Sequence, residues 1–185
     1  MTAIDDRMTG IFENLEVPEG FKAELIRGET VMTAGPDMAH DLIVESIVDQ
    51  IPRTRWHWLQ TQDVAFPADA SEPQPDLVVI ERGTVEGPGR LVPAPAVTLV
   101  VEVVSKTSVL RDYRTKRELY AEGAVPLYLI VDPIKGLCVL LAEPTEASAS
   151  GLPDYVAERT TKFGEPVPLD LLGVVLDTSE FRTYS

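Results

Sequence analysis

The chain has 185 residues, of which 44% are hydrophobic and 25% charged, a composition typical of a globular protein with one core. Its net charge of −14 argues against the broad basic surface that general nucleic-acid-binding proteins carry. No apolar stretch reaches membrane-spanning length, and no basic and then apolar leader opens the chain, so we expect a cytoplasmic protein without contact to a membrane.

The first half of the chain is expected to contain an arm, a hairpin, a helix and two strands. Residues 1–20 are mixed and acidic and form the predicted N-terminal arm, and residues 21–185 form one domain. The predicted elements are, in chain order, a β-hairpin at 21–33 with its turn near Arg27-Gly28, a helix at 38–51 with Asp37 as N-cap and Pro52 at its end, a strand at 56–66 and a strand at 76–81. Trp56 and Trp58 share one face of their strand, which favours packing in the core or an interface over base stacking.

The second half adds the most apolar strand of the chain. Its predicted elements are a Gly/Pro loop at 82–95, a buried strand at 97–104, a helix at 108–123 with Gly123 as C-terminal cap, strands at 127–131 and 137–141, a surface loop at 142–153, a strand at 155–161 and a packed segment at 169–176. Cys138 lies in an apolar run and is expected to be buried. Strands clustered between two helices predict an α/β (α+β) fold, a central mixed sheet flanked by helices with a leading hairpin.

Two carboxylates lie against the predicted core. Glu102 stands in the middle of the buried strand, and Asp76 comes directly before the strand that precedes it in the sequence. An unpaired charge inside a sheet costs several kcal/mol or more, so both acids need a partner, and one shared divalent cation is the simplest. Two alternatives stay open: Glu102 could pair with a buried lysine or arginine, and Asp76 could cap a turn after Pro75.

The basic residues are unevenly distributed. Five of the sixteen fall within residues 106–117, directly after the strand that carries Glu102, which predicts one positive patch beside the site. Lys116 follows Asp112 by four residues, so an exposed helical ion pair could also account for it.

An ordered set of motifs covers residues 21–131. The motifs are Glu24-Leu25-Ile26-x-Gly28-Glu29, His40, Pro75-Asp76, Glu102-Val103-x-Ser105 and Tyr113-x-x-Lys116-x-x-x-Tyr120. Together they resemble the Uma family of restriction-endonuclease-like proteins, which lies within the PD-(D/E)XK nuclease-like superfamily. The resemblance implies a restriction-endonuclease-like core of the order helix–strand–strand–strand–helix–strand.

The resemblance also implies a metal-dependent endonuclease that hydrolyses DNA with a Mg²⁺-activated water, Mn²⁺ being a possible substitute. Asp76 and Glu102 would be the metal ligands, and the backbone carbonyl of Val103 is a third possible oxygen. A small number of carboxylates with several retained waters is the ligand set that Mg²⁺ prefers.

One position departs from the superfamily pattern. Many members carry a lysine two residues beyond the glutamate, where this chain has Val104. We expect Lys116 to take over that catalytic role, with Lys106 as the rival if the strand continues that far. Glu24 could supply a further catalytic carboxylate or face solvent, and His40 is either a base or a polar residue at the helix start.

Two further functions stay open. The chain could be a catalytically degenerate binding or assembly module with a nuclease fold, or it could hydrolyse a smaller phosphate substrate. Because an acidic nuclease must still reach an anionic polymer, we expect a homodimer, formed through the hairpin or an exposed sheet edge, that presents two positive patches to one duplex.

Overall fold

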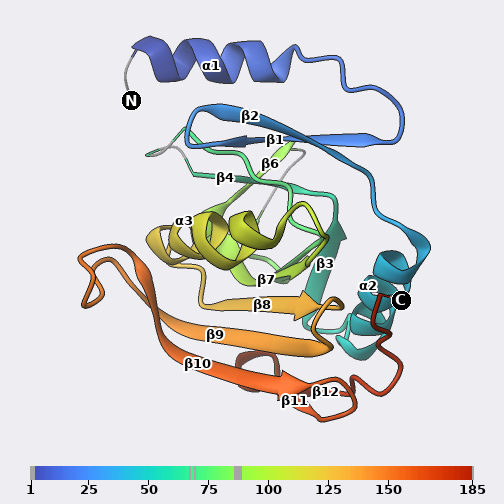
Figure 1. Cartoon of the computed structure of the whole chain (residues 1–185). Helices are drawn as coiled ribbons and strands as arrows, with labels where there is room; N and C mark the ends of the chain where they lie inside the picture. The colour runs from blue at the N-terminus through green and yellow to red at the C-terminus, as the bar shows by residue number, and fades with distance from the viewer. Residues whose placement is uncertain (1–2, 67, 69, 86–88, 185) are drawn as a thin grey trace.

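A six-stranded mixed sheet runs through the molecule, and helices lie on both of its faces (Figure 1). The computed structural model describes residues 3–66, 68, 70–85 and 89–184. The strands of this sheet are, in spatial order, β10 (Asp154–Lys162), β9 (Leu137–Thr145), β8 (Leu127–Asp132), β7 (Val97–Val103), β5 (Leu77–Glu81) and β3 (Trp56–Gln60). β7 and β8 run parallel and the other neighbours in this sheet are antiparallel, which confirms the predicted mixed sheet.

Short elements and helices complete the fold around this sheet. They are α1 (Ala3–Glu13), β1 (Phe21–Ile26), β2 (Glu29–Ala34), α2 (Met38–Gln50), β4 (Asp63–Ala65), β6 (Leu91–Pro93), η2 (Ala94–Ala96), η3 (Arg111–Thr115), α3 (Lys116–Glu122), β11 (Val167–Leu169), η4 (Asp170–Leu172) and β12 (Val174–Leu176). β1 and β2 form the leading hairpin, which lies above the η3–α3 segment in Figure 1.

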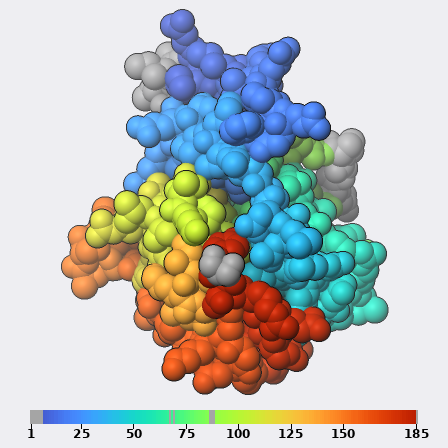
Figure 2. Space-filling model, turned by 45° about the vertical axis from the view of Figure 1, so that its right-hand side comes forward, coloured from blue at the N-terminus to red at the C-terminus, as the bar shows by residue number. Residues whose placement is uncertain are grey.

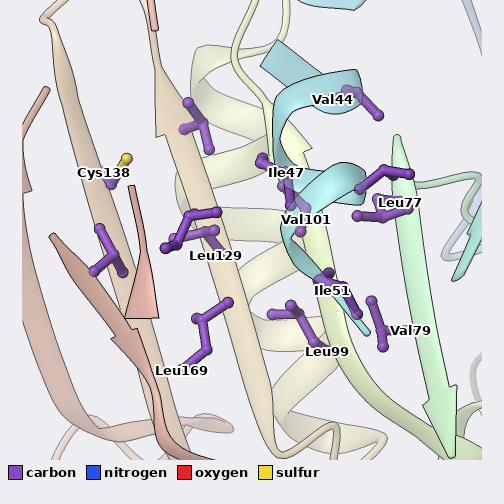
Figure 3. Close-up of a cluster of buried hydrophobic side chains, with 14 of the residues drawn as sticks. Val44, Ile47, Ile51, Leu77, Val79, Leu99, Val101, Leu129, Cys138 and Leu169 are labelled. Atoms are coloured by element: carbon purple, nitrogen blue, oxygen red, sulfur yellow. The ribbon is translucent and has the colours of Figure 1, made fainter. Parts of the chain in front are cut away.

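The two faces of the sheet pack into two apolar clusters. Alternate residues of β7 point to opposite faces, as the two-residue period of a strand requires. Leu99 and Val101 pack with Ile47 of α2, as Figure 3 shows. Val100 packs on the opposite face with Leu119 of α3. The buried strand therefore separates the layer of α2 from the layer of α3.

The predicted hairpin, its turn and the helix after it are confirmed. Asp37 caps α2 by accepting a hydrogen bond of 2.9 Å from the backbone N–H of His40. The single strand expected at 56–66 is wrong: Thr61 adopts φ = 50°, and the chain divides there into β3 and β4. β4 is not part of the central sheet and pairs in parallel with β6. β6 lies inside the region that was expected to be only loop. Trp56 and Trp58 both contribute to the core cluster under α2.

Strand boundaries in the second half differ from expectation. β7 ends at Val103, and β9 continues to Thr145, four residues beyond its predicted end, because it pairs with β10 along its whole length. Gly123 caps α3 as predicted but with φ = −76°, so it is not there for a left-handed conformation. A Cβ at Gly123 would overlap the ring of Phe66, so close packing accounts for the glycine.

The second predicted helix contains a wide turn. Residues 111–115 form a π-helical turn, in which the backbone N–H of Lys116 donates to the carbonyl of Arg111, five residues earlier. The hydroxyl of Tyr128, on β8, donates to the backbone carbonyl of Asp112 inside this turn at 2.9 Å. A side chain of the sheet thus supports the irregular part of the helix.

Two further features concern the helices and the cysteine. Within the described ranges, every helix is too short or too polar to cross a bilayer. Cys138 is buried, and burial raises the pKa of its thiol to about 12. The division of the chain at residue 20 stays a prediction.

Candidate active site

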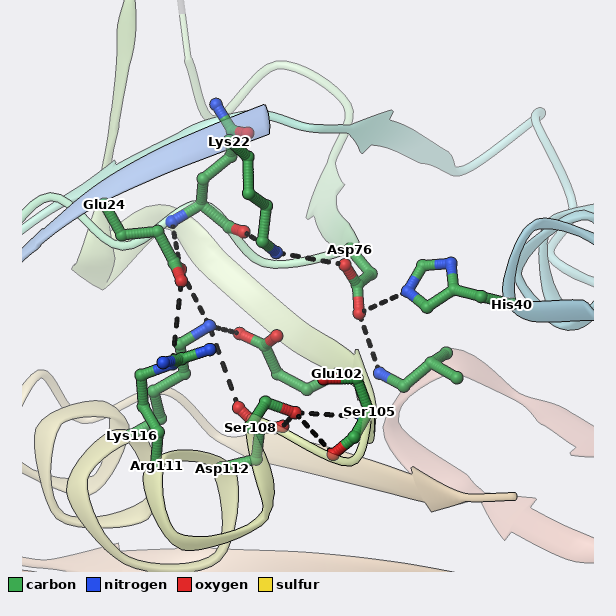
Figure 4. Close-up of polar contacts among 12 residues, drawn as sticks. Lys22, Glu24, His40, Asp76, Glu102, Ser105, Ser108, Arg111, Asp112 and Lys116 are labelled. Atoms are coloured by element: carbon green, nitrogen blue, oxygen red, sulfur yellow. Dashed lines mark hydrogen bonds and ion pairs between the residues drawn. The ribbon is translucent and has the colours of Figure 1, made fainter. Parts of the chain in front are cut away.

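A cavity of about 160 Å³ lies where the hairpin, the start of α2, the end of β7 and the η3–α3 helix meet (Figure 4). Polar side chains from all four elements line it. Those with charged or hydroxyl groups include Lys22, Asp37, His40, Asp76, Glu102, Ser105, Thr107, Ser108, Arg111, Asp112, Lys116 and Tyr184.

The strand register accounts for the meeting of Asp76 and Glu102 at the same cavity. β5 and β7 are antiparallel, and Leu77 pairs with Val101. Asp76 and Glu102 are the next residues in that register, and residues opposite each other across an antiparallel pair point to the same face. The predicted convergence of the two carboxylates on one cavity is therefore what the structure contains.

Lys116 lies at the centre of the buried polar contacts. Its ammonium is 2.6 Å from Oε1 of Glu102 and 2.7 Å from Oε1 of Glu24, and its side chain is 1% exposed. The hydroxyl of Tyr120, one helical turn later, donates to the same oxygen of Glu102 at 2.6 Å. Glu102 therefore has the buried lysine partner that the sequence left open as an alternative to a metal.

Lys106 and Lys116, the two candidate lysines, lie at different places relative to Glu102. Lys106 does not share the face of Glu102, because β7 ends before it, and its side chain is exposed. Lys116 does not form an exposed pair with Asp112, since both side chains are buried and their charged atoms are 3.9 Å apart. The lysine nearest to Glu102 comes from the helix that covers its face of the sheet.

Asp76 has three partners at the rim of the cavity. Its Oδ2 accepts a hydrogen bond of 2.8 Å from the backbone N–H of Val103 and lies 3.0 Å from Nε2 of His40. Its Oδ1 is 3.3 Å from the ammonium of Lys22. Asp76, which directly precedes β5, therefore contacts β7, α2 and the hairpin. Its partners are distant in sequence, so it does not simply cap a local turn.

Glu24 is fully buried, so the expectation that it could face solvent is wrong. Its Oε1 accepts a hydrogen bond from the backbone N–H of Gln74 at 2.9 Å as well as the contact to Lys116. Its Oε2 is buried without a hydrogen bond in the described structure, 3.8 Å from Nε of Arg111. Glu24 is thus a second buried acceptor for the ammonium of Lys116.

Burial and neighbouring charges shift the pKa values of Glu102 and Asp76 in opposite directions. Burial raises the pKa of Glu102 to about 8, because Lys116 offsets only part of the desolvation and Asp76 and Asp112 add negative charge. Burial also opposes ionisation of Asp76, but the charge of Lys22 and the hydrogen bond from His40 hold its pKa well below the usual range. Burial therefore opposes the ionisation of Glu102 more strongly than the neighbouring positive charges favour it.

Glu24 and Lys116 have the opposite balance. Burial would raise the pKa of Glu24, but the charges of Lys116 and Lys22 lower it. Burial would lower the pKa of Lys116, but the two glutamates raise it. One ammonium is shared by two buried carboxyls, so a further cation in the cavity would stabilise the ionised form of Glu102.

The donor set of the cavity can be compared with the requirements of Mg²⁺. Within the described residues, no group of three or more His, Cys, Asp or Glu side chains is arranged to hold a metal. Mg²⁺ does not need such a group, since it keeps several waters and takes one or two carboxylates. Asp76 and Glu102 supply these, and no hydrogen bond from a described residue reaches Oε2 of Glu102. The donor chemistry therefore fits Mg²⁺. Binding of the ion requires the ammonium of Lys22 to move away from Asp76.

Lys22 was missed in the sequence, although it precedes Glu24 by two residues on β1, so the two-residue period of a strand could have placed both on one face. Asp112 and Tyr120 were noted four residues before and after Lys116, the spacing of one helix face, and the structure places Asp112 near the Lys116 ammonium and Tyr120 on Glu102. Arg111 has no such signal, because the π turn changes the spacing there.

The expected positive patch is largely neutralised. Lys116 and Arg111 face buried carboxylates, and Arg117 pairs with Asp154 and Glu158 of β10. Of the five basic residues in 106–117, the two exposed ones are Lys106 and Arg114.

The mixed sheet and its buried acidic and basic residues define an α/β protein with a polar cavity beside its central strands. A comparison with protein families matches residues 11–178 to Uma2, described as "Putative restriction endonuclease". The chain belongs to the Uma2 family, and family and fold together support a nuclease-like function.

A solved structure is similar over nearly the whole chain. It is the crystal structure of "a putative nuclease belonging to DUF820" from Anabaena variabilis, with 14% identity, a TM-score of 0.65 and coverage of 94% of this chain and 92% of that chain. At this identity the likeness shows the shared fold. No curated protein matches the chain.

Proposed function

We propose that the chain is a metal-dependent endonuclease that hydrolyses phosphodiester bonds of DNA with Mg²⁺, for which Mn²⁺ can substitute. The observation that carries this proposal is the meeting of Asp76 and Glu102 on one cavity beside the buried ammonium of Lys116. Family membership supports the reaction class, and the donor chemistry supports the metal.

Asp76 and Glu102 would hold the metal, with the carbonyl of Val103 as a third oxygen. Bound there, the ion would lower the pKa of a bound water and neutralise charge on the phosphate. Lys116 can donate from its ammonium to the attacking water or to a phosphate oxygen, because it lines the cavity. His40 positions Asp76 through the contact between Nε2 and Oδ2.

The direct test is nicking of supercoiled plasmid DNA. We expect cleavage that requires Mg²⁺, stops with EDTA and falls by more than about 100-fold in Glu102→Gln, since even groups behind the ligands are worth 10–100-fold. Glu158→Gln is the control, because this residue lies on β10 and pairs with Arg117 outside the cavity. Cleavage by Glu102→Gln at the wild-type rate would remove the assignment.

A degenerate binding or assembly module is the second candidate, favoured by Val104 at the superfamily lysine position and by the lysines that already pair with both acids. Calorimetry with Mg²⁺ or Mn²⁺ separates the two. Absence of binding heat together with absence of nicking would favour the module.

We also infer that the protein forms a homodimer through the β3 edge of the sheet. In the described structure the only strand paired with β3 is β5, so the outer edge of β3 beyond Trp56, whose N–H donates to the carbonyl of Pro52, can pair with a second copy. The side chains of Met38 and Leu42 on α2 are 77% and 55% exposed beside a groove that α2 shares with β3. Apolar surface next to an open strand suits a two-fold contact.

Light scattering tests this dimer. Wild type should have twice the chain mass at micromolar concentration, and Leu42→Glu should shift it toward the monomer. Val156→Glu is the matched control, because Val156 is 70% exposed on β10, at the other edge of the sheet. A monomeric wild type would contradict the inference.

A further inference from the structure

Two hollows of opposite chemistry flank the candidate catalytic cavity. The first, about 960 Å³, runs along α2 and shares Lys22, His40 and Asp76 with the cavity. The second, about 500 Å³, lies beyond the end of β7 and shares four residues with the cavity. Its lining residues are Asp37, Ala39, Ser105, Lys106, Thr107, Thr183 and Tyr184.

The hollow along α2 is unsuited to a phosphate backbone. Asp41, Glu45 and Asp49 of α2 line it, and the exposed Met38 and Leu42 contribute apolar surface. Carboxylates repel phosphates, and this face has the features of the protein–protein contact described above.

The second hollow offers donors instead. Lys106 is exposed, and no ion pair joins it to a carboxylate in the part of the chain that the structure describes. The hydroxyls of Ser105 and Thr107 are 3.3 Å apart, so they lie side by side on the same wall. The phenol of Tyr184, a further hydrogen-bond donor, lines the same hollow.

The segment that carries these donors follows β7 in the chain and is held in shape by hydrogen bonds between Ser105 and Ser108. The backbone N–H of Ser105 donates to the hydroxyl of Ser108 at 2.9 Å, and the N–H of Ser108 returns to the carbonyl of Ser105 at 3.1 Å. Figure 2 shows the C-terminal residues next to this segment, between α2 and the yellow region around η3. One carboxylate, Asp37, also lines the hollow, and its Oδ1 is engaged in capping α2.

We propose that Ser105, Lys106, Thr107 and Tyr184 form a binding subsite for a phosphate of the nucleic-acid strand next to the bond that is cut. The strand then leaves the cavity past the end of β7 and not along α2. This subsite rests on the proposed function for the identity of the strand, but it makes a separate statement about binding. Lys106, which the sequence placed as a rival catalytic residue, becomes a residue that positions substrate.

Binding of a fluorescent DNA duplex in EDTA, followed by anisotropy across salt concentrations, tests the subsite without any cleavage. Loss of one lysine–phosphate contact reduces the slope of log K against log salt by about 1. We expect Lys106→Gln to show this reduction and weaker binding, whereas Lys162→Gln, an exposed lysine on β10, leaves both unchanged. In cleavage assays, Lys106→Gln should raise KM more than it changes kcat.

Two further arms separate the alternatives. If the strand ran along α2, Glu45→Gln would tighten binding and Lys106→Gln would have no effect, which would overturn the proposal, as would equal slopes in wild type and Lys106→Gln. Inorganic phosphate should displace the duplex no more than chloride of equal ionic strength; specific displacement would indicate a site for the free ion. A reduced slope in a protein that cuts no plasmid would keep the subsite and remove the nuclease.

Discussion

Replacing Lys116 with methionine is expected to lower the free energy of unfolding by about 3–5 kcal/mol, the usual cost of removing one partner from a buried ion pair. The ammonium is 1% exposed and is the nearest positive charge to both Glu24 and Glu102. Without it, two buried carboxyls share a pocket with no adequate counter-charge. Urea unfolding in EDTA measures the change.

The loss of unfolding free energy in Lys116→Met should grow as pH rises. In Lys116→Met the folded-state pKa values of the two glutamates lie above the unfolded value of about 4.3, so the folded state binds more protons than the unfolded state. Stability is then retained at low pH and lost as pH rises through the folded pKa values. Adding Glu102→Gln should restore part of the stability at pH 8.

Lys162→Met provides the reference for this measurement. Its side chain is exposed on β10, so we expect a change within about 0.5 kcal/mol. A Lys116→Met protein as stable as wild type at pH 8 would show that the ammonium does not hold the two glutamates.

Asp76→Asn is expected to reduce Mg²⁺-dependent cleavage by more than about 100-fold while the protein stays folded, since asparagine keeps the shape of the side chain and loses its charge. The same change should lower the pKa of His40. In wild type, burial would lower that pKa, and the hydrogen bond and charge of Asp76 raise it above 6.5. With asparagine the charge of Asp76 is lost, so the lowering of the His40 pKa by burial and by Lys22 is opposed chiefly by the contact with Asp41.

Proton NMR can follow this pKa because the chain has two histidines, and His57 serves as an internal reference. Glu158→Gln, the control used for plasmid nicking, is also the control for the His40 titration, because Glu158 pairs with Arg117 on β10, away from His40. An unchanged His40 pKa in Asp76→Asn would mean that the contact between Nε2 and Oδ2 is absent in solution.

Much of the candidate site could be predicted because its signals are local. A glutamate inside an apolar strand and an aspartate directly before the preceding apolar strand are visible in the sequence, and their meeting follows from antiparallel pairing. Lys116 was also predictable, because a helix must cover the face of the sheet that carries Glu102. The order of strands and helices indicated the mixed sheet for the same reason.

The remaining features depend on contacts that are distant in sequence. Thr61 breaks a strand without a glycine or proline to signal it, and β6 forms only because β4 lies beside it. The buried state of Glu24 depends on Gln74 and Lys116, fifty and more residues away. The neutralisation of Arg117 by β10 is equally non-local, so a count of charges within 106–117 overestimated the positive surface.

The π-helical turn before α3 links the direction of the Lys116 side chain to a residue outside the cavity. An α-helix rotates by about 100° per residue, so the extra residue of the π turn sets which side of the helix Lys116 occupies. Tyr128 supports that turn from β8 although it does not line the cavity. The direction of the Lys116 side chain therefore depends partly on β8. A substitution at Tyr128 should change the position of the ammonium although Tyr128 does not line the cavity.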